Sequence, residues 1–315
     1  MTQSFEVPSD PSDQPPDYNQ KLADLFTDND RPELPRPTHD LAVEGFNEDY
    51  ENYKDRPYHN GEHPIDVLTR QLLWMEYLAD KAGIRLELED YEVAVLGAPY
   101  HDNKLNAENG VSAEKLSAQV IADRLRRPEY EGRYKERFIK RVTNSIESTE
   151  VEYKGDDVLL THVLQAEPDI AAVSLVLADI AAVVTEDGDK IIVDASKLAA
   201  EKLYTLKDGQ IPLEEVMAIF DKQPKFTLQR FLELPAILDR HLGPEKAAKV
   251  LASMQEHIQE QRKRLLAQAA LIADHHDYIL KQVEPVVNNP DMSPIQKSFA
   301  FAKVLLNLVH SEKPL

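Results

Sequence analysis

Residues 64–83, PIDVLTRQLLWMEYLADKAG, decide the fold class of this chain. Pro64 suits the first position of an α-helix, where its missing N–H has no helical partner to lose. Apolar residues recur at helical spacing and favour one broad face, namely Ile65, Leu68, Leu72, Leu73, Met75 and Leu78. Gly83 follows them, and glycine is the residue that most often ends a helix. The stretch therefore predicts an amphipathic helix with one face in a core.

The same helical periodicity continues on both sides of this stretch and predicts an all-α fold, arranged as a helical bundle. Helices are expected from about residue 40 onward, near 90–100, 113–126, 134–148, 168–184, 195–207, 212–222, 226–282 with a break near Gly243, and 293–312. Residues 186–194 are the exception. Their Asp-Gly pair followed by Lys-Ile-Ile-Val predicts a short hairpin or loop.

Composition divides the chain into three parts. Residues 1–38 contain seven of the 20 prolines, so we expect a disordered or extended tail with at most a helical turn near 21–26. Residues 39–205 form the expected core, which contains the candidate site residues described below. Residues 206–315 form a helical C-terminal extension that we expect to pack on that core.

The formal net charge of −20 argues against broad nucleic-acid binding, which depends on Lys and Arg contacts to phosphates. A small phosphorylated substrate stays open, because a bound cation reverses the local field in an acidic cleft. The acidity equally serves solubility alone. No apolar run has the length of a membrane span, and no secretory signal is visible, so we expect a cytoplasmic protein without membrane contact. Homo-oligomerisation stays open.

Cysteine is absent, so any transition metal must be bound through His and carboxylate side chains. Three places supply such residues: the stretch Tyr58–Val67 with His63, the pair His101-Asp102, and Asp179. Asp179 lies in a run of Ile, Ala, Val and Leu, where burying an unpaired carboxylate costs about several kcal/mol. A divalent cation would meet that requirement.

Each of these residues alone has an ordinary explanation. A His-Asp dipeptide is common by chance, and Asp179 would equally pair with a buried Arg or cap a helix break. His162 and the run His275-His276-Asp277 are more simply satisfied or solvated histidines. Only the combination of His63, the pair and Asp179 in this order indicates a site.

That combination resembles the HD superfamily of metal-dependent phosphohydrolases, whose ligands come in the order His, His-Asp, Asp on a helical core. The resemblance covers about residues 55–185 and implies that His63, His101, Asp102 and Asp179 bind one divalent metal ion. The first motif of cyclic-nucleotide phosphodiesterases is similar to Tyr58-His59-Asn60-x-x-His63-x-x-Asp66-Val67. The resemblance makes His59 the candidate general acid, and Asp66 would contact a metal ligand without binding the ion itself. Residues 114–118 (EKLSA) and the step Ile146-x-x-Thr149 resemble uncharacterised bacterial members.

Departures from the family pattern argue against a second metal ion. The phosphodiesterases have a further His where this chain has Leu105, and the bacterial group often has one where this chain has Glu152. The sequence does not distinguish Mn, Mg, Fe, Co, Ni or Zn. Lys104 is a candidate phosphate contact, although a solvated loop lysine explains it as well, and Glu114 is a candidate near the metal or substrate.

The resemblance implies a phosphohydrolase in which metal-activated water attacks a small phosphate ester, with a nucleotide monoester or diester as the expected class. Asp102 and His59 are the expected catalytic residues, and Asp66 or Glu62 would orient a histidine. The alternative is a non-catalytic ligand-binding or regulatory protein that keeps the HD core.

Overall fold

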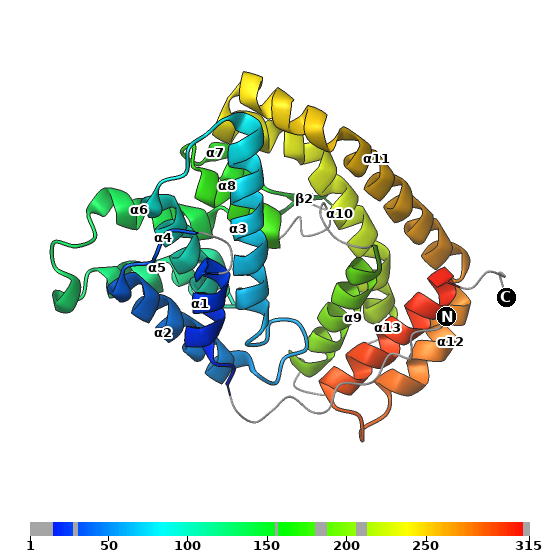
Figure 1. Cartoon of the computed structure of the whole chain (residues 1–315). Coiled ribbons are helices and arrows are strands. Elements are labelled where there is room, and N and C mark those ends of the chain that lie inside the picture. The colour runs from blue at the N-terminus through cyan, green and yellow to red at the C-terminus, as the bar shows by residue number, and fades with distance from the viewer. Residues whose placement is uncertain (1–14, 28–30, 155–156, 180–187, 206–212, 311–315) are drawn as a thin grey trace.

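The computed structural model describes residues 15–27, 31–154, 157–179, 188–205 and 213–310 (Figure 1). In chain order the elements are α1 (Tyr18–Thr27), α2 (Arg36–Tyr53), α3 (His63–Ala82), α4 (Leu88–Gly97), η1 (Ala98–Tyr100), α5 (Ala113–Leu125), η2 (Pro128–Tyr130), α6 (Glu136–Glu147), β1 (Glu152–Lys154), β2 (Asp157–Leu159), α7 (Thr161–Gln165), α8 (Ile170–Asp179), α9 (Gly188–Thr205), α10 (Leu213–Leu242), α11 (Pro244–Asp274), α12 (His276–Val287) and α13 (Pro294–His310). Within these ranges β1 and β2 pair as one antiparallel hairpin, and the rest is helix and loop. The all-α prediction is confirmed.

Helix α3 follows the predicted bounds closely. Pro64 occupies its first turn, and Gly83 ends it in the left-handed conformation (φ 62°) with its N–H donated to the carbonyls of Ala79 and Asp80. Of the predicted apolar face, only Leu73 stays largely exposed. None of the helices described is both long enough and apolar enough to cross a membrane.

The apolar side chains form two separate clusters. The first gathers residues from α1 to α8 together with the second half of α10 and much of α11. The second gathers α9, the start of α10, the end of α11, α12 and α13. Figure 1 shows these as two groups of helices, with α10 and α11 running between them. The clusters do not divide at residue 205, because α9 packs mainly against α13 and α10.

The N-terminal stretch differs from the expected tail. Residues 18–27 form α1, and Tyr18, Leu22 and Phe26 are buried in the first cluster. These residues repeat every four positions, which places them on one face of a helix despite the surrounding prolines. Residues 36–38 already belong to α2, whose N-cap is Pro35.

The predicted hairpin at 186–194 is wrong for the residues the structure describes there. Residues 188–194 are the first turns of α9, because Ile192 is buried against the second cluster and tertiary burial outweighs the local β preference. Residues 186 and 187 lie outside the described part, as do residues 180–184 of the helix predicted to continue past Asp179.

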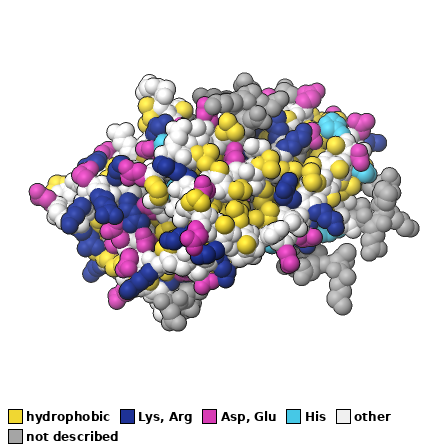
Figure 2. All heavy atoms as spheres, turned by 90° about the horizontal axis from the view of Figure 1, so that it is seen from above, with side chains coloured by type: hydrophobic (Ala, Val, Ile, Leu, Met, Phe, Trp, Pro, Cys, Tyr) yellow, Lys and Arg dark blue, Asp and Glu magenta, His cyan; other side chains and the backbone are white. Residues whose placement is uncertain are grey.

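Charged side chains of both signs interleave at the left of Figure 2, on the side of the molecule formed by α5 and α6. Several arginines of α5 and the turn after it are paired with acids. Arg127 donates two hydrogen bonds to Glu44, Arg124 contacts Glu44 and Glu48, and Arg126 pairs with Glu136. Their carboxylate partners neutralise these cations, so they form no basic stripe of the kind that binds nucleic acid.

Candidate metal centre

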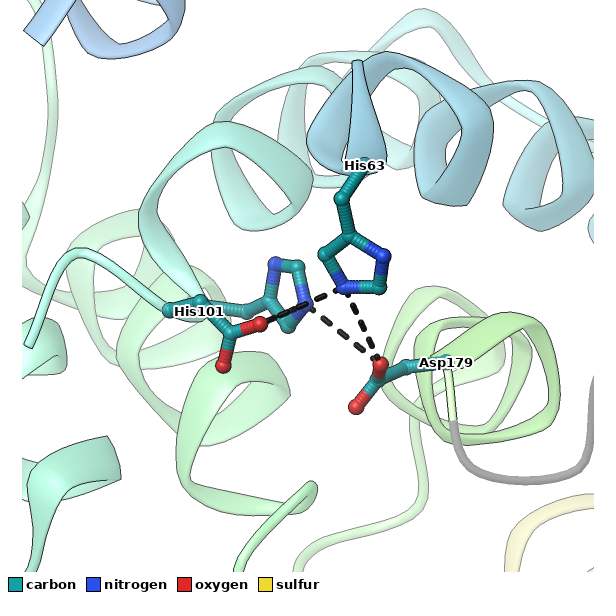
Figure 3. A group of neighbouring side chains, drawn as sticks. His63, His101 and Asp179 are labelled. Carbon is teal, nitrogen blue, oxygen red and sulfur yellow. Dashed lines mark ion pairs between the residues drawn. The ribbon is translucent and has the colours of Figure 1, made fainter. Parts of the chain in front are cut away.

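Three helix ends bring the four predicted ligands together. His63 is the first residue of α3, His101 and Asp102 follow the 3-10 turn η1 at the end of α4, and Asp179 is the last residue of α8. One ligand atom from each of the four lies within 4.8 Å of the others, and this is the one such group among the described residues. Figure 3 shows His63, His101 and Asp179 pointing toward a common point from these separate elements.

The ring nitrogens face the carboxylates at short range. Asp102 Oδ2 lies 3.1 Å from His101 Nε2 and 3.3 Å from His63 Nε2. Asp179 Oδ1 lies 3.5 Å and 3.6 Å from the same two nitrogens. Two nitrogen and two oxygen donors around one point are a donor set suited to a divalent transition metal.

A backbone hydrogen bond orients His101 for this role. Its Nδ1–H donates to the carbonyl of Ala98 at 2.6 Å, which leaves the Nε2 lone pair directed into the group. Pro99 lies in the same 3-10 turn, whose tighter winding replaces the last turn of α4 just before the pair. This local geometry turns two adjacent side chains toward one point.

Two buried atoms of the group lack a hydrogen bond within the described part of the chain. They are Nε2 of His63 and Nε2 of His101. A buried polar atom without a partner costs about 1–3 kcal/mol, so such atoms are rare unless a ligand or water meets them. The donor set and these two orphaned nitrogens both fit a bound metal ion.

Electrostatics favour a cation at this point. Burial lowers the pKa of the His101 imidazole, but Asp102 and Asp179 raise it well above its usual range. Burial raises the pKa of Asp179, yet the neighbouring His101 and His63 hold it below the usual range. The group therefore attracts positive charge, as protons or as a divalent ion that displaces them.

His59 stands beside the four residues without belonging to them. Its Nε2 lies 3.7 Å from Asp102 Oδ2, and its Nδ1 lies 2.7 Å from Oε1 of Glu201. Glu201 also accepts the backbone N–H groups of Tyr58 and His59, at 3.1 and 2.9 Å, and the Nη1–H of Arg56 at 3.1 Å. The ring of His59 is thereby fixed with Nε2 toward the candidate metal position.

The sequence did not point to Glu201. It lies 142 residues after His59 on α9, a helix whose apolar side chains belong to the second cluster. Burial raises its pKa, but the contacts from His59 and Arg56 outweigh burial and hold the pKa at about 2. The one local signal for a role of Glu201 is its position directly after Ala199 and Ala200, which are buried, because a buried glutamate needs a partner.

The orienting role expected of Asp66 or Glu62 does not fit the structure. Both side chains are exposed, Asp66 in the first turn of α3 and Glu62 at 4.0 Å from Lys21. Asp66 follows His63 by three residues, but the ring of His63 turns inward while this carboxylate faces solvent near a helix N-terminus, where negative charge is favourable.

The loop after the His-Asp pair is held by the EKLSA motif. The backbone N–H of Lys104 donates to Ser117 Oγ at 2.9 Å, and both residues are partly or fully buried. Burial raises the pKa of Glu114, with Glu150 and Asp102 adding to it, so Glu114 lies within electrostatic reach of the group. A contact of Lys104 or Glu114 with substrate stays a prediction.

The remaining histidine candidates lie elsewhere. His162 contacts Glu147 at 3.3 Å and Glu150 at 3.5 Å, and His276 lies 3.6 Å from Asp277. Neither is part of the group around His63.

No family model, no curated protein and no solved structure matches this chain. The residues themselves therefore carry the assignment of the site.

Proposed function

We propose that this protein is a metal-dependent phosphohydrolase that acts on a small phosphate ester, with a nucleotide monoester or diester as the expected substrate. One observation carries the proposal: two carboxylates converge on one point with two buried imidazole nitrogens that form no hydrogen bond within the described residues, and a third histidine is held beside them. A purely structural histidine cluster would need no such neighbour.

His63, His101, Asp102 and Asp179 would hold the ion. A divalent ion held there supplies a Lewis acid that polarises a phosphoryl oxygen and lowers the pKa of water. The imidazoles are only 6% and 0% exposed, whereas the side chains of Asp102, Asp179 and His59 are 22%, 17% and 24% exposed. Substrate would therefore approach from the side of the carboxylates and His59.

His59 would donate the proton that the leaving oxygen needs. Its Nδ1–H donates to Glu201, so Nε2 is the nitrogen directed at the reaction side, and Glu201 holds the ring in this orientation. General acid catalysis of this kind contributes about a hundredfold to ten-thousandfold in rate.

The test is a hydrolysis panel of phosphomonoesters, phosphodiesters and nucleotides with added Mn²⁺, Mg²⁺, Co²⁺ or Fe²⁺. We expect turnover of at least one class with one of these ions, and loss of it in Asp102→Asn. Metal binding without turnover of any class would contradict the proposal and favour a ligand-binding protein that keeps the core. His59→Ala separates the roles, because it should keep the metal and slow most the substrates with poor leaving groups.

A further inference from the structure

The face of α9 that is turned away from the second cluster is polar. The apolar side chains of this helix, Ile192 and Ala199 among them, pack in the second cluster. Consecutive residues of a helix are about 100° apart around its axis, so Asp194, Lys197 and Glu201 share the opposite face. A helix of the second cluster therefore presents two acids and a lysine on its far side.

Glu201 fixes this face of α9 against the residues beside the metal centre. Glu201 is 6% exposed, and its Oε1 lies 2.7 Å from Nδ1 of His59 and 3.1 Å from Nη1 of Arg56. The other ring nitrogen of His59 is 3.7 Å from Oδ2 of Asp102. Lys197 precedes Glu201 by four residues, which is about 6 Å along the helix axis. Lys197 is thus one helical turn from a residue in contact with the site.

Asp194, on the other side of Lys197, also acts on this region. The ring of Tyr58 packs on that of the candidate ligand His63, with the ring centroids 4.8 Å apart. Burial, and then Asp194, raise the pKa of the Tyr58 hydroxyl well above its usual range, so Asp194 lies within electrostatic reach of Tyr58. Lys197 therefore stands between two acids that both face the residues around the metal centre.

Lys197 has no partner for its positive charge within the part of the chain that the structure describes. Its side chain is partly buried and forms neither a hydrogen bond nor an ion pair there. Arg56, by contrast, is held by Glu201 at 3.1 Å. An ammonium group held partly away from water is stabilised by an opposing charge. Lys197 is therefore available to an anion that is not part of the chain.

We propose that Lys197 binds the phosphate group of the substrate, so that the second cluster supplies a substrate-binding residue to a metal centre built by the first. Asp102 and Asp179 carry two negative charges, which offset the two positive charges of a divalent ion. A phosphate ester brings further negative charge, and a lysine ammonium binds phosphate as a point charge. The inference rests on the proposed function for the nature of this anion.

The test is the affinity of the Mn²⁺-loaded, full-length protein for inorganic phosphate, measured by calorimetry. We expect Lys197→Gln to weaken phosphate binding by about tenfold or more, because a contact to a charged group is lost, and to leave the Mn²⁺ content unchanged. Lys197→Arg, which keeps the charge, should recover most of the affinity. Lys202→Gln is the matched control, since Lys202 is an exposed lysine on another face of α9, and it should bind phosphate like the natural chain.

Chemical acetylation of the natural chain, followed by mass spectrometry, tests the same contact without any substitution. Phosphate should slow the acetylation of Lys197 in the Mn²⁺-loaded protein and leave that of Lys202 as it is. Equal acetylation of Lys197 with and without phosphate would overturn the inference. So would equal phosphate affinity in Lys197→Gln and the natural chain, a natural chain that binds no phosphate, or loss of Mn²⁺ in Lys197→Gln.

The same measurements separate this inference from the proposed function. Phosphate binding that depends on Lys197, in a natural chain that hydrolyses no ester, would leave Lys197 as an anion ligand and remove the phosphohydrolase proposal. Hydrolysis by the natural chain, together with equal phosphate affinity in Lys197→Gln, would remove the inference about Lys197 alone.

Discussion

Helices α4 and α8 pack side by side, and their two ends handle charge in opposite ways. Each has 10 residues, so both span about 15 Å from one end to the other. Their N-terminal ends meet Arg141 of α6, which donates from Nε to Asp169 at 2.6 Å and from Nη2 to Asp90 at 2.6 Å. Their C-terminal ends lead to the candidate metal centre.

The N-terminal end is a closed network, which we call the arginine clamp (Arg141 with Asp90, Asp169 and Glu89). Asp169 also accepts the N–H of Ala171, and Asp90 forms a capping box with Glu87, so each acid has a structural partner. A cavity of about 520 Å³ borders the clamp, but each of the three carboxylates of the clamp already contacts Arg141. We therefore assign it no ligand.

At the C-terminal end the carboxylates face histidines instead of an arginine. Its two carboxylates face imidazoles whose Nε2 atoms have no hydrogen bond among the described residues. The comparison teaches that a cluster of buried acids indicates a binding site only where the chain does not provide the opposing charge. Substitutions at the two ends should therefore have different effects.

The largest effect should follow removal of a metal ligand. Asp102→Asn should lower hydrolysis by about a thousandfold or more, because it removes a ligand from the candidate site and the partner of His59. The free energy of unfolding of the metal-free protein should change by less than about 1 kcal/mol, because the substitution removes both the attraction of Asp102 to His101 and its repulsion of Asp179. Turnover assays and urea denaturation check both. A large loss of stability without metal would place Asp102 in a structural network like the clamp.

The opposite pattern is expected at the clamp. Arg141→Met should reduce the free energy of unfolding by about 3 kcal/mol, because it leaves Asp169 and Asp90 buried without their cation. Metal stoichiometry should be unchanged. Denaturant melts check the loss, with Arg85→Met as a control because the Arg85 side chain is 89% exposed. If the two variants are equally stable, the clamp is not a stabilising network.

Glu201→Gln should reduce turnover by about 10- to 100-fold without changing the metal content, because it removes the charge that fixes and stabilises the His59 ring. Steady-state kinetics and elemental analysis separate the two effects. Glu215→Gln, an exposed acid at the start of α10, is the control. Loss of metal in Glu201→Gln would mean that this residue supports the ligands rather than the acid.

The smallest effect concerns pH at the clamp end. Neutral His241 donates from Nε2 to the Val163 carbonyl and accepts the Asp169 N–H at Nδ1, and burial lowers its pKa. The unfolded chain therefore binds the proton first, so stability should fall as the pH drops below about 6.5, by at most about 1.4 kcal/mol per pH unit.

Unfolding measured between pH 7.5 and about 5 checks this, and His241→Gln should flatten the dependence. His257→Gln, an exposed histidine on α11, should leave it as it is. An unchanged slope in His241→Gln would show that other groups dominate.

The four candidate ligands were predictable from sequence because each belongs to a short motif or, for Asp179, stands out as an acid in an apolar run. The helical bundle was predictable because residues such as Ile65 and Leu68 repeat at helical spacing. Glu201 was not, since its contacts with Tyr58 and His59 depend on how the distant helix α9 packs. Helix α1 was missed because Pro15 and Pro16 masked the spacing of Tyr18, Leu22 and Phe26.

Calorimetric titration with Mn²⁺, of the natural chain and of the double variant His101→Ala with Asp179→Asn, measures whether this group binds metal. We expect saturable binding of at least one ion to the natural chain. We expect loss of that binding in the double variant, which should still fold because the clamp at the other end of α4 and α8 is intact. No saturable binding to the natural chain, or equal binding to both proteins, would contradict the assignment of this group as a metal centre.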